Sequence, residues 1–182
     1  MLHRTCQISE ALELCDRQHI PSSLQNARDV LRAELLTWSL ATDDCHLANS
    51  GAGPLEIVSR QACAFHSAVL ILYHRSIEPH PLINPQKEVL TAWENLTIAE
   101  QKKQYDIQNQ KYGAPMSWPG FIAACEAVDR QPWIEWWEAV QRYNLGTFRR
   151  QWDIIQEIWD MVDVGMCWRE ALHRSGKLIL PI

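Results

Sequence analysis

Apolar residues recur along much of the chain at the three- and four-residue spacing that places them on one face of an α-helix. Residues 23–46 carry one such stripe, formed by Leu24, Ala27, Leu31, Leu35 and Trp38. A second helix can begin at Pro54, because proline is tolerated in a first helical turn. Its stripe is formed by Val58, Ala62, Phe65, Val69 and Leu72. No sustained two-residue alternation typical of a strand occurs, so the pattern predicts helices.

The middle of the chain contains two breaks in this pattern. The prolines of the segment EPHPLINP forbid a continuous helix and predict a connector. The helical pattern resumes from Gln86 to about Gln110, and its polar far end is expected to project into solvent. The second break is the turn-rich segment KYGAPMSWPGF. Within it, Ser117 with Pro119 is expected to cap the start of the next helix.

Further helices are predicted toward the C-terminus. Asp129 and Pro132 mark the end of one helix and the start of the next, and Gly146 precedes a long helix. A short final helix over residues 167–173 is expected to end at Gly176, and the apolar LILPI tail is expected to dock on the bundle. The stripe of the long helix is formed by Phe148, Trp152, Ile155, Trp159 and Val162.

Together these segments predict an all-α fold of about seven helices in one bundle-like or solenoid-like array with Pro-rich connectors. A length of 182 residues fits a single domain that spans residues 1–182. Six side chains on the regular stripes are expected to be buried: Phe65, Val69, Leu72, Trp152, Ile155 and Trp159.

Composition and charge narrow the classes of function. A net charge of −5 and a pI near 5.8 leave no basic field for phosphates, so direct nucleic-acid binding is not expected. No segment resembles a signal peptide or reaches the roughly 20 apolar residues of a membrane helix. We therefore expect an intracellular chain, cytoplasmic or nuclear, that has no membrane partner. Gly-rich phosphate loops, GxSxG elbows and HExxH motifs are absent, and we expect no cofactor.

The six cysteines lie at least nine residues apart. Zinc sites draw thiolates in pairs two to four residues apart, so no metal site is expected. Cys63 and His66 could supply two ligands, but no second pair is evident. We expect the cysteines to be reduced and mostly buried.

Residues 118–159, WPGFIAACEAVDRQPWIEWWEAVQRYNLGTFRRQWDIIQEIW, resemble the fungal-specific transcription factor domain of zinc binuclear-cluster regulators of the arginine-metabolism-regulator type. The segments CAFHSAVLILYHRSI and CWREALHRSGKLILPI resemble the same family. The resemblance covers roughly residues 55–182, and residues 1–50 more weakly. It implies the all-helical C-terminal regulatory domain of such regulators. Full-length members also carry an N-terminal six-cysteine zinc cluster that reads DNA, whereas the cysteines here are scattered.

We therefore expect a stand-alone, non-DNA-binding helical module that binds a small apolar or aromatic metabolite or a partner regulator. The alternative is a repurposed, cofactor-independent enzyme of fungal specialised metabolism, of the cyclase or isomerase type. Such a reaction needs mainly shape, desolvation and one or two acid/base groups. Relative to a longer family member, this chain is expected to expose an apolar patch that a partner or a second copy, in a homo-oligomer, would cover.

Nine tryptophans supply candidate walls for a ligand pocket. The pocket is expected between the helix of residues 58–73 and the two Trp-rich C-terminal helices. His66, Glu126 and Asp160 are the candidate acid/base or orienting groups. The simpler interpretation, that the indoles fill the core and His66 is a satisfied buried histidine, stays open. The candidate ligand-binding residues are Phe65, Tyr73, Trp118, Trp133, Trp137, Trp152 and Trp159.

One pair of these rings raises a packing problem. Adjacent residues on an ideal helix point about 100° apart. Trp136 and Trp137 therefore cannot both be buried by a single helix face.

The charge and the missing zinc cluster lead to a first prediction. In a gel-shift assay at physiological salt, the isolated chain is expected to shift no DNA. Co-purification is expected to recover a partner regulator or a bound small molecule instead. Tight, sequence-specific DNA binding would contradict this hypothesis.

Overall fold

The computed structural model describes residues 1–15, 20–38, 53–77, 84–105 and 114–176. Within these ranges the chain forms eight α-helices and one short 3₁₀ turn at Gln141–Tyr143, with no strand. The predicted all-α class is confirmed. The helices are α1 (Leu2–Leu14), α2 (Ser22–Thr37), α4 (Gly53–Ser76), α5 (Gln86–Tyr105), α6 (Ser117–Glu126), α7 (Gln131–Val140), α8 (Gly146–Asp163) and α9 (Trp168–Ser175).

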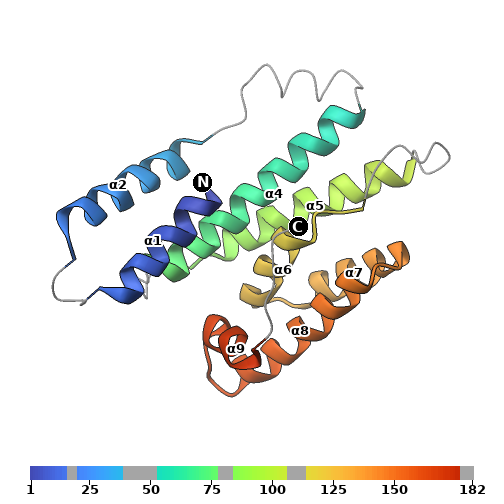
Figure 1. Ribbon diagram of the computed structural model, residues 1–182. Helices are drawn as coiled ribbons and strands as arrows, with labels where there is room; N and C mark the ends of the chain where they lie inside the picture. The colour runs from blue at the N-terminus through green and yellow to red at the C-terminus, as the bar shows by residue number, and fades with distance from the viewer. Residues whose placement is uncertain (16–19, 39–52, 78–83, 106–113, 177–182) are drawn as a thin grey trace.

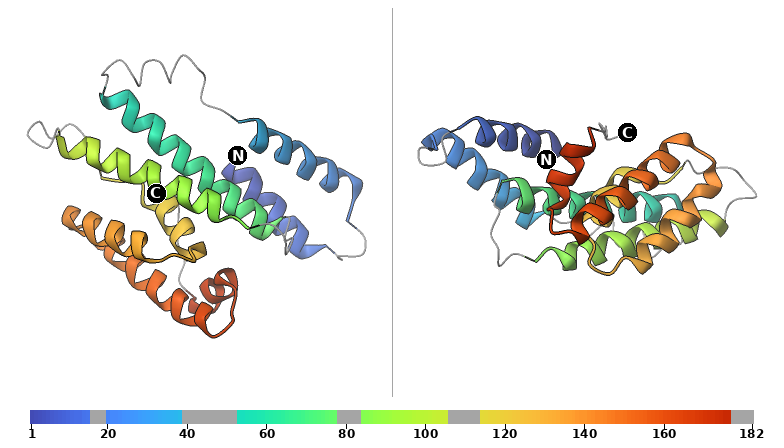
Figure 2. Two further views of the ribbon diagram at one scale, coloured as in Figure 1. Left: turned by 180° about the vertical axis from the view of Figure 1, so that it is seen from behind. Right: turned by 90° about the horizontal axis from the view of Figure 1, so that it is seen from below.

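The two long helices α4 and α5 run antiparallel, side by side, through the middle of the molecule, and α6 packs against both (Figure 1). Beyond α6 lie α7, α8 and α9, and α8 contacts α6, α7 and α9. On the other side of α4 lie α1 and α2; α1 contacts α4, and α2 packs on α1 (Figure 2). Helix α4 is therefore shared between the C-terminal helices and the N-terminal pair.

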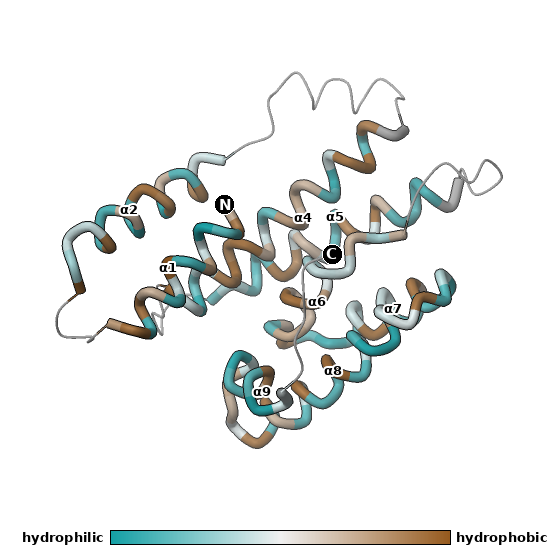
Figure 3. Tube along the Cα trace, in the orientation of Figure 1, coloured by the Kyte–Doolittle hydropathy of each residue, from teal (hydrophilic) through white to brown (hydrophobic). Residues whose placement is uncertain are grey.

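Helix α4 carries two apolar faces, offset by one residue and hence by about 100°. Hydrophobic residues occur along its whole length (Figure 3). Ala64, Ala68 and Ile71 form one face and are 0% exposed. The predicted stripe lies on the neighbouring face, where Val69 is buried as expected but Val58 is 61% exposed. The expected burial of Phe65 and Leu72 was wrong, because the packed core covers the neighbouring face instead; both side chains are only partly buried.

Five indoles form a continuous chain of ring contacts from α7 to α8. Both Trp136 and Trp137 are buried, at 4% and 0% exposed. Helix α7 contacts both α5 and α8, so more than one of its faces is covered and each ring has a side to fill. Successive ring centroids lie 6.2, 5.1, 6.3 and 5.5 Å apart along Trp133, Trp136, Trp137, Trp152 and Trp159.

The stripe of α8 is confirmed for Ile155 and Trp159, which are 0% and 6% exposed. Trp152 is only partly buried, so its expected burial was wrong. The fully buried face of α8 includes Ile154 and Ile158. Trp152 lies at the edge of this face, where its ring stacks on that of Trp137.

Most of the predicted helix starts and ends are confirmed, but the predicted N-cap at Ser117 is not. Gly176 ends α9 in the left-handed conformation at φ 61°, as expected. Pro132 lies in the first turn of α7 and Gly146 begins α8. Ser117 is not a cap: Met116 occupies the N-cap position in an extended conformation, and the backbone is already helical at Ser117.

Three expectations fall wholly or partly on segments that the structure does not describe. The helix predicted over residues 23–46 begins at Ser22 and ends at Thr37, and residues 39–46 lie outside the described residues. The polar end of α5 beyond Tyr105 and the LILPI tail lie outside them too. Helix α1 is an addition to the helices predicted from apolar stripes. Its buried residues include the polar Thr5 and Ser9, so its buried face does not form a regular apolar stripe.

One stretch within α4, Leu55–Ser76, is long and apolar enough to cross a membrane. The core helix of a globular protein passes the same test. Helix α4 packs against α1, α5 and α6, so this stretch is weak evidence for a membrane span.

The contact between α6 and α7 gives a prediction at Gly120. A Cβ atom there would lie 2.8 Å from a ring carbon of Trp136, whose indole is buried and packed against the rings of Trp133 and Trp137. We expect Gly120→Ala to lower the free energy of unfolding by about 1–3 kcal/mol, although alanine is the better helix former. Gly146→Ala is the control, because no atom lies within 4 Å of its Cβ position. Urea unfolding measures both variants, and equal stability of Gly120→Ala and the native chain would contradict the close contact.

Candidate functional site

A cavity of about 480 Å³ lies beside the half-covered face of α4. Its volume is in the range of small-molecule sites. Side chains of α4 form one wall, and the start of α1, the residue after α2 and the residue before α6 form the rest. None of the described lining residues has a charged acidic or basic side chain: they are Met1, Leu2, Trp38, Val58, Gln61, Ala62, Phe65, His66, Val69 and Met116.

His66 is the ionisable side chain of this cavity. Its Nε2 atom lies 2.9 Å from the backbone carbonyl oxygen of Leu35 in α2. A carbonyl oxygen only accepts hydrogen bonds, so Nε2 carries the proton and donates. Burial lowers the pKa of His66 below its ordinary value, while the bond to Leu35 opposes this shift. The neutral ring therefore has its proton on Nε2 and a lone pair on Nδ1.

Aromatic rings hold this histidine and the wall beside it. The indole of Trp38 stacks on the imidazole of His66, with centroids 4.2 Å apart and planes inclined by 20°. Phe65 contacts Trp118 at a centroid distance of 5.0 Å, which links the cavity wall to the buried start of α6. Large flat rings on two sides suit a flat apolar ligand.

The cavity lies on α4, as expected, but its other walls differ from those expected. The N-terminal segments supply them, whereas the Trp-rich helices α7 and α8 pack into the core. Of the candidate ligand-binding residues, Phe65 lines the cavity and Trp118 contacts Phe65. The other candidates are buried or partly buried among core residues: Tyr73, Trp133, Trp137, Trp152 and Trp159.

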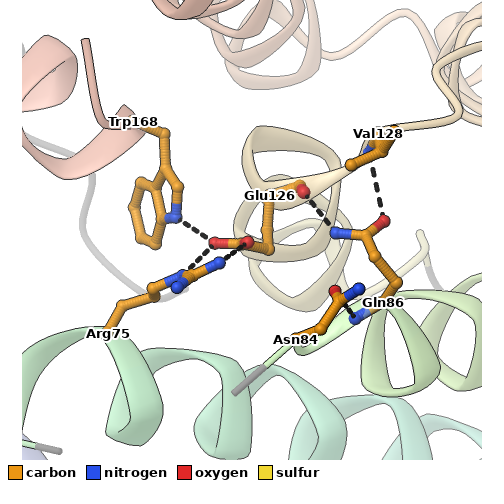
Figure 4. A network of polar contacts seen from close by, with 6 residues as sticks. All are labelled: Arg75, Asn84, Gln86, Glu126, Val128 and Trp168. Atoms are coloured by element: carbon orange, nitrogen blue, oxygen red, sulfur yellow. Dashed lines mark hydrogen bonds and ion pairs between the residues drawn. The ribbon is translucent and has the colours of Figure 1, made fainter. Parts of the chain in front are cut away.

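Glu126 lies elsewhere, at the C-terminal end of α6, with its side chain 6% exposed. Its carboxylate accepts two hydrogen bonds from Arg75, one of them 2.8 Å long from Nε, and a third of 2.6 Å from Trp168 Nε1 (Figure 4). The hydrogen bonding to Glu126 raises the pKa of Arg75. The backbone carbonyl of Glu126 accepts a 2.8 Å bond from Gln86, whose side-chain oxygen accepts one of 3.1 Å from Val128 N–H.

A wider cleft of about 860 Å³ surrounds this cluster between the ends of α4, α6, α8 and α9. A second ion pair, Arg130 with Asp163 at 2.6 Å, lies at its edge. The Arg130 guanidinium also lies 5.1 Å from the ring centroid of Trp159. These four charged groups are thus bound to one another in pairs, and Arg169, which also lines the cleft, pairs with Glu13 of α1.

The three candidate acid/base residues are not brought together. His66 lines the apolar cavity, Glu126 lines the ion-paired cleft, and Asp160 is exposed on α8. Arg75 and Trp168 were not singled out as partners of Glu126. A signal was present, because Glu126 and Arg75 follow strongly apolar runs and a charge buried there needs a partner.

The cysteines do not gather into a metal site among the described residues, where no cluster of three or more potential ligands occurs. The expectation that the cysteines are mostly buried was wrong. Only Cys125 is buried among the five described, and burial raises the pKa of its thiol. Cys6 and Cys167 are exposed, and Cys167 Sγ accepts a bond from the Glu170 N–H at the start of α9.

In the part of the chain that the structure describes, the protein is an all-helical domain with an apolar cavity and a separate ion-paired cluster. The family of the fungal specific transcription factor domain matches residues 1–182, so the chain belongs to this family. The match extends the resemblance to the N-terminal helices and gives the chain a regulatory-domain origin. No curated protein and no solved structure matches the chain.

The Glu126 cluster gives a stability prediction. Arg75→Met removes two hydrogen bonds and leaves a buried carboxylate with Trp168 alone. We expect a loss of about 3 kcal/mol, the lower end for breaking a buried pair, because a third of the Arg75 side chain is exposed. The control is Arg174→Met, whose partner Glu170 is half exposed, with an expected loss below about 0.5 kcal/mol. Equal losses in chemical unfolding would contradict the special role of the buried pair.

Proposed function

We propose that this chain is an effector-binding regulatory domain, and that a small apolar molecule with a flat ring system is its effector. The observation that carries the proposal is the cavity on the half-covered face of α4. It combines a suitable volume, aromatic walls from Trp38 and Phe65, and two neutral hydrogen-bonding side chains, His66 and Gln61. Family membership supports a regulatory role for such a site.

The position of the cavity supports regulation as well as binding. Its walls belong both to α4, which is part of the central core, and to the N-terminal segments that contain Leu2 and Trp38. A ligand between them contacts both parts at once. It would bind more tightly when both parts face the cavity than when they are apart, and would therefore stabilise that arrangement.

In this proposal the chain binds a small effector molecule and does not itself bind DNA. Its net charge of −5 offers little attraction to phosphates. Such a domain acts inside the cell together with a DNA-reading regulator. For the catalytic alternative, the cavity supplies His66 alone of the three candidate acid/base residues, because Glu126 and Asp160 lie elsewhere.

A cavity-filling variant tests the proposal. Ala62 lines the cavity, so Ala62→Phe would occupy the space that the ligand needs. We expect the native chain to bind the methyl ether of β-naphthol in an NMR titration. Ala62→Phe is expected to weaken this binding at least about tenfold, which corresponds to about 1.4 kcal/mol.

The matched control is Ala139→Phe. Ala139 is exposed on α7 and lines a different, smaller hollow of about 250 Å³. This variant should bind the probe as the native chain does. Circular dichroism and thermal unfolding check that both variants fold. Equal binding by both variants, or binding of none of β-naphthol, its methyl ether and β-naphthoate by the native chain, would overturn the proposed function.

A further inference from the structure

The hydrogen bond of His66 fixes which polar group the cavity can recognise. Its Nε2 atom already donates to the Leu35 carbonyl at 2.9 Å. No described residue hydrogen-bonds to Nδ1, and this atom is not among the buried unpartnered atoms. Since His66 also lines the cavity, the Nδ1 lone pair is open as a hydrogen-bond acceptor.

The rest of the cavity lining removes other options. None of its described side chains is a lysine, an arginine or an acid, so a carboxylate or phosphate on the ligand would find no side-chain counter-charge. A ketone or ether offers only acceptor atoms, which the Gln61 amide can meet but which leave the Nδ1 lone pair without a donor. A hydroxyl group, by contrast, can donate to Nδ1.

We infer that the effector is a neutral, flat apolar molecule with a hydroxyl group, a phenol or an alcohol, that donates a hydrogen bond to His66 Nδ1. This inference rests on the proposed function and specifies its ligand class. Trp38 holds the imidazole by stacking, and Leu35 holds its tautomer, so the acceptor is oriented before the ligand arrives. Affinity comes from the apolar walls, while selection among apolar molecules comes from His66.

Three probes of similar shape test the inference on the native chain: β-naphthol, its methyl ether and β-naphthoate. We expect β-naphthol to bind about five- to tenfold more tightly than the ether, as one neutral hydrogen bond allows. β-Naphthoate is expected to bind more weakly than both. Equal affinities for β-naphthol and its ether, or tighter binding of β-naphthoate, would overturn the inference and leave the cavity standing. Failure of all three probes to bind would overturn the proposed function as well.

The variant His66→Phe keeps a ring against Trp38 but removes the acceptor. It is expected to bind β-naphthol and the ether with equal affinity. Binding of the ether reports whether the cavity of the variant is intact. A retained preference for β-naphthol would show that another group accepts the hydroxyl and would overturn the inference.

Nitrogen NMR of isotopically labelled native protein tests the geometry without a substitution. The Nδ1 signal of His66 is expected at the position of an unprotonated ring nitrogen. It is expected to move when β-naphthol is added and to stay when the ether is added. A protonated Nδ1 in the unliganded chain would overturn the inference.

Discussion

A buried carboxylate sets the main constraint on this fold. The Glu126 side chain is almost removed from water, and a charge in that position is costly unless it is paired and hydrogen-bonded. Arg75 and Trp168 satisfy the carboxylate, and Gln86 binds the backbone carbonyl of the same residue. These partners come from α4, α9 and the start of α5, so one residue of α6 joins the ends of four helices.

The same constraint orients the helix that carries the cavity. His66 precedes Arg75 by nine residues on α4, roughly 14 Å at 1.5 Å per residue. The Arg75 end is tied to the core by the ion pair, whereas the His66 region meets the N-terminal segments through Leu35 and Trp38. The cavity therefore has one wall anchored in the core and another that belongs to the N-terminal helices.

The sequence was sufficient for the helices and much of the core, because spacing reports which residues share a face. It was not sufficient for choosing between two faces of α4, which are both apolar and one residue apart. Ala64 and Ala68 fill the core, while Val58 and Phe65 remain half-covered. Spacing also could not show that α7 packs on two sides and buries both Trp136 and Trp137. Such choices depend on neighbours far away in the sequence.

The cavity itself was harder to predict, because its hydrogen-bonding character depends on a backbone atom. Leu35 has no side-chain feature that marks it as a partner, yet its carbonyl fixes the tautomer of His66. Apolar walls alone give affinity that grows with buried area, about 25 cal/mol per Å², and discriminate poorly between molecules of similar shape. A site that holds an oriented acceptor discriminates better, since a ligand without a donor leaves that acceptor unpaired on burial. For the effector proposed here, selectivity would therefore originate in the contact between α2 and α4 rather than in the tryptophan-rich core.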